Sequence, residues 1–211
     1  MDTNNVFDQN MRLYEEWFTK NSNIFDSEIE VLKQVLPTSG KGIEIGVGTG
    51  IFSSRLGIKD GVEPSQEMRS KAIERGVKVI DSFAEELPIP DETYDFALMV
   101  TVDCFLSDPL KAFKEAWRII SKDGLFIVAF IDKNTPLGKV YEQNKSDNIF
   151  YKNAKFHSAN QIETLLRNSG FVIVDKKQTV FNLVNKKQEI LSGVGKGVFA
   201  VIKGKKTISR E

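Results

Sequence analysis

The chain has 211 residues, 41% hydrophobic and 27% charged, so it is long enough for one sizeable folded domain and is not a disordered polypeptide. Its 29 basic and 29 acidic side chains cancel, and a chain without net charge has no overall field to hold a polyanion, which disfavours nucleic acid as a partner. The single cysteine, Cys104, excludes an internal disulfide framework and a thiolate zinc cluster, and we expect no metal site.

The sequence favours a protein that does not enter a membrane. The longest purely apolar run, Leu125–Ile131, is much shorter than the roughly 18 residues that a membrane-spanning helix needs. The first residues, Met1–Asn5, have neither the basic start nor the apolar core of a secretory signal. We therefore expect a soluble, cytoplasmic protein that acts as a monomer or homodimer and has no membrane partner.

Two amphipathic helices are predicted at the beginning of the chain. Apolar and aromatic residues recur at helical spacing over Val6–Lys20. A second helix is expected from Ser27 to Leu36, with Ser27 as its N-cap. These helices predict a helical N-terminal extension over residues 1–38 that serves as a lid.

From Gly40 onward, short apolar strands alternate with helices. Strands are expected at Lys41–Ile45, Gly61–Glu63, Val77–Ile80, Tyr94–Val102, Gly124–Ile131, Phe171–Val180 and Gly197–Lys203. Helices are expected at Thr49–Leu56, Ser65–Arg75, Asp108–Ile120 and Ser158–Asn168. This alternation predicts βαβ crossovers and a parallel sheet, whereas the last two strands follow one another without a helix, as antiparallel strands do.

The predicted fold class is therefore α/β, with a doubly wound, Rossmann-like sheet of seven strands. The sheet is expected to be mostly parallel with an antiparallel C-terminal edge. We expect one domain over residues 1–211, in which residues 39–211 form the Rossmann-like core.

The most informative motif is the glycine-rich turn Glu44–Gly50, which lies between the first strand and the next helix. Doubly wound sheets bind their ligands at this place, and Gly46 and Gly48 allow a ligand to approach the backbone closely. A dinucleotide fingerprint would need a third glycine where the chain has Ile51, and the lysine of a phosphate-binding loop is absent. At the end of the second strand, Glu63 is placed to accept hydrogen bonds from both hydroxyls of a ribose.

These segments resemble the class I S-adenosylmethionine-dependent methyltransferases, most closely the small group called methyltransferase type 11. The similarity extends from about Tyr14 to the last strand and depends on several short motifs that follow the order of the family. The motifs are Glu44–Gly50, Glu63-Pro64-Ser65, Ala84-Glu85-Glu86-Leu87-Pro88, Tyr94-Asp95, Glu115–Ile120 and Lys122-Asp123-Gly124. The chain departs from the family before Ala84, where Ser82-Phe83 replaces the usual Gly-Asp pair.

The resemblance implies S-adenosylmethionine as the methyl donor and S-adenosylhomocysteine as its product. It implies that the donor binds to four segments: the glycine-rich turn, the acid after the second strand, the segment after the third strand, and the end of the fourth strand. The implied residues are Glu44, Gly46, Val47, Gly48, Thr49, Gly50, Glu63, Pro64, Ser65, Phe83, Ala84, Glu85 and Thr101. Since the usual acid is missing at position 83, Phe83 is expected to stack on the adenine or wall it in.

Residues on the acceptor side are predicted from their positions. Methyl transfer requires alignment of an acceptor lone pair with the methyl group and exclusion of water, so a catalytic base is optional. Candidates for a catalytic role are Asp103, which could orient an amine, His157, the only histidine, and Tyr14. Residues expected at the acceptor or in the lid are Tyr14, Trp17, Phe18, Phe105, Tyr141 and Tyr151.

The sequence therefore predicts in-line transfer of a methyl group to a small-molecule acceptor. One alternative is a non-catalytic module that binds S-adenosylmethionine or S-adenosylhomocysteine as a sensor. The other is an NAD(P)-dependent oxidoreductase, against which Ile51 and the antiparallel end of the sheet argue.

Overall fold

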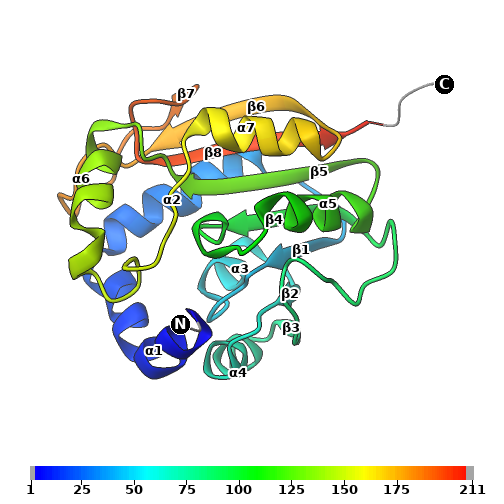
Figure 1. The fold of residues 1–211 in the computed structure, drawn as a ribbon, viewed down its shortest axis with the longest axis horizontal. Coiled ribbons are helices and arrows are strands. Elements are labelled where there is room, and N and C mark those ends of the chain that lie inside the picture. The colour runs from blue at the N-terminus through cyan, green and yellow to red at the C-terminus, as the bar shows by residue number, and fades with distance from the viewer. Residues whose placement is uncertain (1–2, 208–211) are drawn as a thin grey trace.

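The computed structural model, which describes residues 3–207, is organised around one eight-stranded sheet (Figure 1). The strand order is β3-β2-β1-β4-β5-β8-β6-β7. The strands are β1 (Gly42–Ile45), β2 (Asp60–Val62), β3 (Lys78–Ile80), β4 (Tyr94–Val100), β5 (Ile120–Ile131), β6 (Phe171–Thr179), β7 (Leu191–Ser192) and β8 (Phe199–Lys206). The strands from β3 to β5 pair in parallel and the remaining pairs are antiparallel, which confirms the predicted sheet.

The sheet has one strand more than the seven predicted. The additional strand, β7, pairs with β6 only at Leu191 and Ser192. So short a strand shows none of the alternation of apolar and polar residues by which strands are recognised. β5 also begins earlier than predicted, because Ile120 already pairs with Tyr94 before the register shifts and pairing resumes at Leu125.

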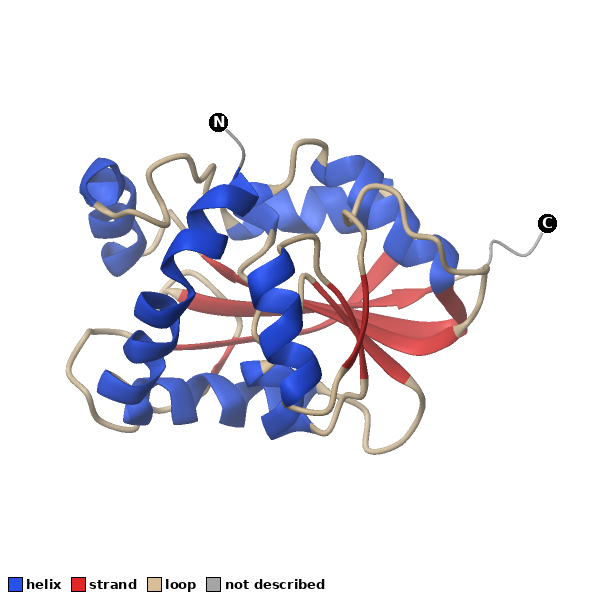
Figure 2. Ribbon diagram, turned by 90° about the horizontal axis from the view of Figure 1, so that it is seen from below, coloured by secondary structure: helices blue, strands red, loops and turns tan. Residues whose placement is uncertain are grey.

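The helices lie on both faces of the sheet and beyond one end of it (Figure 2). They are α1 (Thr3–Lys20), α2 (Ser22–Val35), α3 (Ile51–Leu56), α4 (Gln66–Glu74), α5 (Pro109–Ile119), α6 (Pro136–Asn144) and α7 (Ala159–Asn168), with 3-10 turns η1 (Asp103–Phe105) and η2 (Lys145–Asp147). No helix within residues 3–207 is long and apolar enough to cross a membrane.

The helix caps agree with the sequence except in α2. The hydroxyl of Ser65 and the carboxylate of Asp108 cap α4 and α5, and Ser158 forms the predicted capping box with Gln161. Ser27 is not the N-cap of α2, since that helix begins five positions earlier and the Ser27 hydroxyl donates to the carbonyl of residue 23 inside it. An apolar face that continues across a polar residue extends a helix beyond the cap that the local sequence suggests.

Packing separates the two helices of the predicted N-terminal extension. On one face of the sheet, α5 and α7 bury Phe113 and Ile162. On the other face, α2 buries Phe25 and Leu32 against the strands, so α2 is part of the core. By contrast, α1 lies beyond the carboxyl ends of the parallel strands and next to α4 (Figure 1), with Phe18 packed into the same cluster as α2.

Candidate functional site

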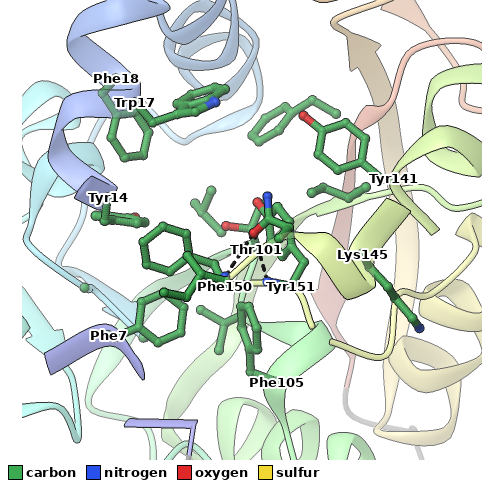
Figure 3. Close-up of a pocket in the computed structure, with 18 of the residues that line it drawn as sticks. Phe7, Tyr14, Trp17, Phe18, Thr101, Phe105, Tyr141, Lys145, Phe150 and Tyr151 are labelled. Carbon is green, nitrogen blue, oxygen red and sulfur yellow. Dashed lines mark hydrogen bonds between the residues drawn. The ribbon is translucent and has the colours of Figure 1, made fainter. Parts of the chain in front are cut away.

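A cavity of about 1050 Å³ lies at the carboxyl ends of β1 and β4. Its walls come from α1, α2 and α6, from the glycine-rich turn after β1, and from the chain between η2 and α7 (Figure 3). Single small-molecule pockets usually measure about 300–1,000 Å³, so the cavity has room for more than one small ligand.

Gly48 of the glycine-rich turn faces this cavity. Its φ is +54°, a left-handed conformation that a residue with a side chain rarely adopts. A Cβ atom at this position would meet nothing nearer than the Tyr14 hydroxyl, 3.7 Å away, and would point into the cavity. At Gly46, by contrast, a Cβ would come within 2.4 Å of Val102 Cγ2. The turn therefore keeps the space next to Gly48 open and packs closely at Gly46.

The Glu63 side chain is held at the edge of this space by backbone donors. The N–H groups of Gly48 and Ser65 each donate to a different carboxylate oxygen, both over 2.9 Å. Burial raises the pKa of Glu63 although these hydrogen bonds oppose the rise. Because each carboxylate oxygen has two lone pairs, Glu63 keeps an acceptor site on both oxygens for a pair of neighbouring hydroxyls.

The residues predicted to bind the cofactor fall into two groups. Those that line the cavity are Gly46, Gly48, Glu63, Pro64, Phe83, Ala84, Glu85 and Thr101. Those that are not among the lining residues are Glu44, Val47, Thr49, Gly50 and Ser65. Glu44 is fully buried, where desolvation raises its pKa to about 8, and accepts a hydrogen bond from Ser53 at the start of α3. Four residues of the second group thus belong to the glycine-rich turn itself but do not face the cavity.

Phe83 forms an exposed part of the wall, with 57% of its surface accessible. An aromatic ring in this position suits the stacking that its place in the motif implies. Glu85 instead holds the neighbouring loop, since its carboxylate accepts hydrogen bonds from the Ser107 hydroxyl and from the backbone of Ser107 and Asp108.

The Glu115–Arg118 pair holds the segment that carries Phe83. Glu115 accepts the backbone N–H of Leu87 over 2.8 Å, and Arg118 donates to the carbonyl oxygens of Leu87 and Ile89 over 2.9 and 2.7 Å. The Arg118 guanidinium also lowers the pKa of the Glu115 carboxyl. Two motifs far apart in the sequence thus form one structural unit, in which the second positions the first.

Thr101 follows β4 directly, in a conformation that is rare for a β-branched residue. Its φ is +52°, and residues held in such regions typically cost about 1–3 kcal/mol. This backbone turns the chain sharply from β4 toward η1 at the cavity wall. Strain of this kind is common where a fold shapes a binding site.

The first helix is attached to the glycine-rich turn and to α4 by acidic side chains. Glu15 forms an ion pair with Arg75 and accepts a hydrogen bond from the Thr49 hydroxyl, while Arg75 also donates to the Thr49 carbonyl over 2.8 Å. Burial alone would raise the pKa of Glu15, but the hydrogen bonds and the charge of Arg75 outweigh it and lower the pKa. Asp8, nearer the start of α1, accepts a hydrogen bond from Ser65 at the N-terminus of α4.

Aromatic side chains join α1 to the chain on the opposite side of the cavity. The ring of Phe7 stacks on Phe150 at 5.4 Å and meets the edge of Phe105 at 5.3 Å, and Tyr14 contacts Phe150 at 6.0 Å. Figure 3 shows these rings together, with Tyr141 across the open space from Trp17 and Phe18. The predicted acceptor and lid residues all line the cavity, namely Tyr14, Trp17, Phe18, Phe105, Tyr141 and Tyr151.

Two of the predicted catalytic residues lie elsewhere. His157 Nδ1 is 2.8 Å from Asp103 Oδ2, and neither residue is among those that line the cavity. Burial raises the pKa of Asp103, and its second oxygen has no hydrogen-bond partner among the described residues. The pair connects η1 to the segment just before α7, away from the residues that line the cavity.

The sequence analysis missed Glu28, which lies on α2 and lines the cavity. The side chain is buried, and within the described part of the chain it has neither a hydrogen bond nor an ion pair. Desolvation raises its pKa to about 8. The available signal was a carboxylate on the apolar face of a helix, between Ile24 and Leu32 at helical spacing.

Comparisons with known proteins place this site in a family. A model described as a methyltransferase domain matches residues 43–128. A crystal structure from Thermotoga maritima, described as a SAM-dependent methyltransferase and possible histamine N-methyltransferase, is 44% identical, with a TM-score of 0.93 over 96% of this chain and 99% of that chain. This chain belongs to the S-adenosylmethionine-dependent methyltransferases.

Two further relatives extend the comparison. An uncharacterized protein from Methanocaldococcus jannaschii is 43% identical over 204 residues, 96% of this chain and 99% of that protein. A phosphatidylethanolamine N-methyltransferase from Cereibacter sphaeroides is 27% identical over 65% of this chain and 72% of that protein. The enzyme is thus a methyltransferase whose cofactor is S-adenosylmethionine, and the family decides against the oxidoreductase alternative.

Replacement of Gly48 by valine tests whether the space in front of it holds the cofactor. The new side chain would fill that space, so Gly48→Val should lose binding of S-adenosylhomocysteine by at least about 100-fold in calorimetry, equivalent to roughly 2.7 kcal/mol. The matched control is Gly57→Val, which has a similar positive φ of 75° but no atom within 4 Å of its Cβ. Normal binding by folded Gly48→Val would contradict the assignment.

The raised pKa of Glu28 predicts how stability depends on pH. The folded state keeps a proton up to about pH 8, whereas the unfolded chain loses it near 4.5, so this group makes the free energy of unfolding fall as pH rises between those values. Denaturant titrations of the ligand-free protein should show that the free energy of unfolding falls less with pH in Glu28→Gln than in wild type. The difference should be a few kcal/mol, because one pKa unit corresponds to about 1.4 kcal/mol. Glu44 should sustain part of the fall in both proteins. Identical pH profiles would contradict the burial of an unpaired carboxyl.

Proposed function

We propose that this enzyme transfers a methyl group to a small-molecule acceptor that occupies the cavity beside the cofactor. The supporting observation is that one continuous cavity is lined at one end by Gly48 and Glu63 and elsewhere by aromatic residues of α1 and α6. The balanced charge of the chain supports a small molecule over a nucleic acid as acceptor.

Each part of the cavity has a role in this proposal. Glu63 would hold the ribose hydroxyls of the cofactor, Phe83 would lie against the adenine, and the backbone at Gly48 would border the donor. When bound, S-adenosylmethionine supplies a methyl group already activated by its sulfonium. The chain therefore has to align the acceptor with that group and keep water away.

The first helix is proposed to act as the lid that keeps water out. Its attachment through Glu15 and Arg75, together with the contact of Phe7 and Tyr14 with Phe150, supports closure over both ligands. Lids of this kind open to admit ligands and release products.

The relatives suggest which acceptors to test first. The names of the Thermotoga maritima and Cereibacter sphaeroides proteins both describe N-methyltransferases. Small nitrogen compounds are therefore the first class to test, with oxygen and carboxylate compounds beside them.

The proposed function is tested by incubating the enzyme with S-adenosylmethionine labelled in its methyl group and a panel of small amines, phenols and carboxylates. We expect labelled product from at least one class, and none with Gly48→Val. Tight binding of S-adenosylhomocysteine without methylation of any acceptor would contradict the proposal and favour the sensor alternative.

A further inference from the structure

Glu28 is a buried carboxylate that faces the acceptor part of the cavity. The side chain is 8% exposed, and within the described residues it forms neither an ion pair nor a hydrogen bond. An ionised carboxylate is strongly unfavourable in such a place unless a positive group pairs with it. Glu28 therefore needs a positively charged partner, and a bound ligand can supply it.

Glu28 interacts electrostatically with titratable side chains from three other segments. Its charge contributes to the raised pKa values of Tyr14 on α1, Tyr141 on α6 and Tyr151 after η2, although burial is the larger cause for each. The pKa of Tyr141 rises to about 12, so these tyrosines are neutral at physiological pH. They add no charge that could balance the carboxylate.

The lysines that line the same cavity are paired with other residues. Lys20 Nζ lies 3.1 Å from a carboxylate oxygen of Glu16. Lys145 Nζ lies 2.6 Å from Glu142 and donates to a backbone carbonyl over 3.1 Å. Neither lysine contacts Glu28 in the described structure.

Aromatic rings complete the surroundings. Trp17, Phe18, Tyr141 and Tyr151 line the cavity together with Glu28. The faces of such rings attract an organic cation, and their bulk suits an apolar body attached to it. A carboxylate among aromatic rings is an arrangement that favours an ammonium ion over a neutral or anionic ligand.

We propose that the acceptor is a small primary or secondary amine with an apolar or aromatic body, held as its ammonium ion by Glu28, which then takes the proton from the nitrogen. This inference rests on the proposed function and names the acceptor class of the same site. An alcohol or a carboxylate brings no positive charge to balance Glu28, and a site built for one polar group rejects analogues that lack it.

The bonds made and broken in the proposed reaction balance. The ammonium ion gives one proton to the Glu28 carboxylate, which frees the lone pair of the nitrogen. That lone pair forms the new bond to the methyl carbon, while the methyl–sulfur bond breaks and its electron pair stays on sulfur. The products are a methylated ammonium ion, a neutral thioether and a protonated Glu28, which releases its proton to solvent.

The experiment compares wild type, Glu28→Gln and Glu16→Gln. The last variant is the matched control, because Glu16 also lines the cavity but its carboxylate is paired with Arg12 and Lys20. The probes are 2-phenylethylamine and tryptamine, with 2-phenylethanol and 3-phenylpropanoate as analogues. Each protein is first titrated with S-adenosylhomocysteine. The three dissociation constants should agree within about twofold, which corresponds to about 0.4 kcal/mol.

Two measurements then test the role of Glu28: the rate of amine methylation and the release of a proton on amine binding. With the labelled donor, Glu28→Gln should lose at least about 100-fold in kcat/KM for the amines, the lower range for loss of a general base, while Glu16→Gln matches wild type. The second readout is calorimetry of amine binding to the S-adenosylhomocysteine complex at pH 7.5, repeated in buffers of different ionisation enthalpy. In wild type, it should show that a proton is released when the amine binds. The release should be absent in Glu28→Gln, because an ammonium ion drives Glu28 to ionise.

The outcomes separate this inference from the proposed function. Methylation of the alcohol or carboxylate probes in preference to the amines, or amine turnover unchanged in Glu28→Gln, would overturn the role of Glu28 and leave the proposed function standing. Binding of S-adenosylhomocysteine without methylation of any probe, or of any compound in the wider panel, would overturn both.

Discussion

The ion pair between Glu15 and Arg75 joins the first helix, which forms one wall of the cavity, to the glycine-rich turn that forms another. Glu15 belongs to the first helix, and Arg75 follows α4 and also donates to the Thr49 carbonyl in the glycine-rich turn. One half-buried pair thus connects the helix proposed as the lid to the backbone proposed to border the cofactor. In the proposed function, loss of this pair would loosen the contact of α1 with the glycine-rich turn and give water easier access to the transferring methyl group.

Two carboxylates on the wall of the cavity differ in what surrounds them. Glu63 accepts backbone hydrogen bonds from Gly48 and Ser65, so its orientation is fixed before any ligand arrives. Glu28 has no such donors in the described structure, and its environment favours the protonated form. Burial raises the pKa of Tyr14 and the charges of Glu63 and Glu28 add to the rise, while its hydroxyl lies 3.7 Å from the position of a Cβ on Gly48. The difference in environment suits one carboxylate to binding and the other to accepting a proton.

Much of this architecture could be predicted because its signals are local. The alternation of strands and helices, the glycine-rich turn and the acid at position 63 each depend on a few neighbouring residues. The aromatic face of α1 was also predictable, since helical spacing places Tyr14, Trp17 and Phe18 together. These local signals predicted the sheet, the end of the cavity that Gly48 and Glu63 line, and the first helix, which forms one of its walls.

The remaining features depend on contacts between distant segments. Asp103 and His157 looked like catalytic residues in the sequence, but their pairing across 54 positions is decided by how η1 meets the start of α7. Glu85 matches a cofactor motif, yet its carboxylate is occupied by the loop at Ser107. The burial of Glu28 could not be predicted from its own helix, because an acidic residue on a helix is usually exposed. It depends on α1 and α6, which line the same cavity.

Hydrogen exchange over residues 6–20 tests most directly whether α1 is a lid that closes on the cofactor. Protection of this segment should rise when S-adenosylhomocysteine is added to the wild-type enzyme. In Arg75→Met, which removes the partner of Glu15, protection without ligand should be lower while the strands of the sheet stay protected as in wild type. Equal protection of residues 6–20 with and without S-adenosylhomocysteine would contradict the lid and show α1 to be a fixed part of the fold.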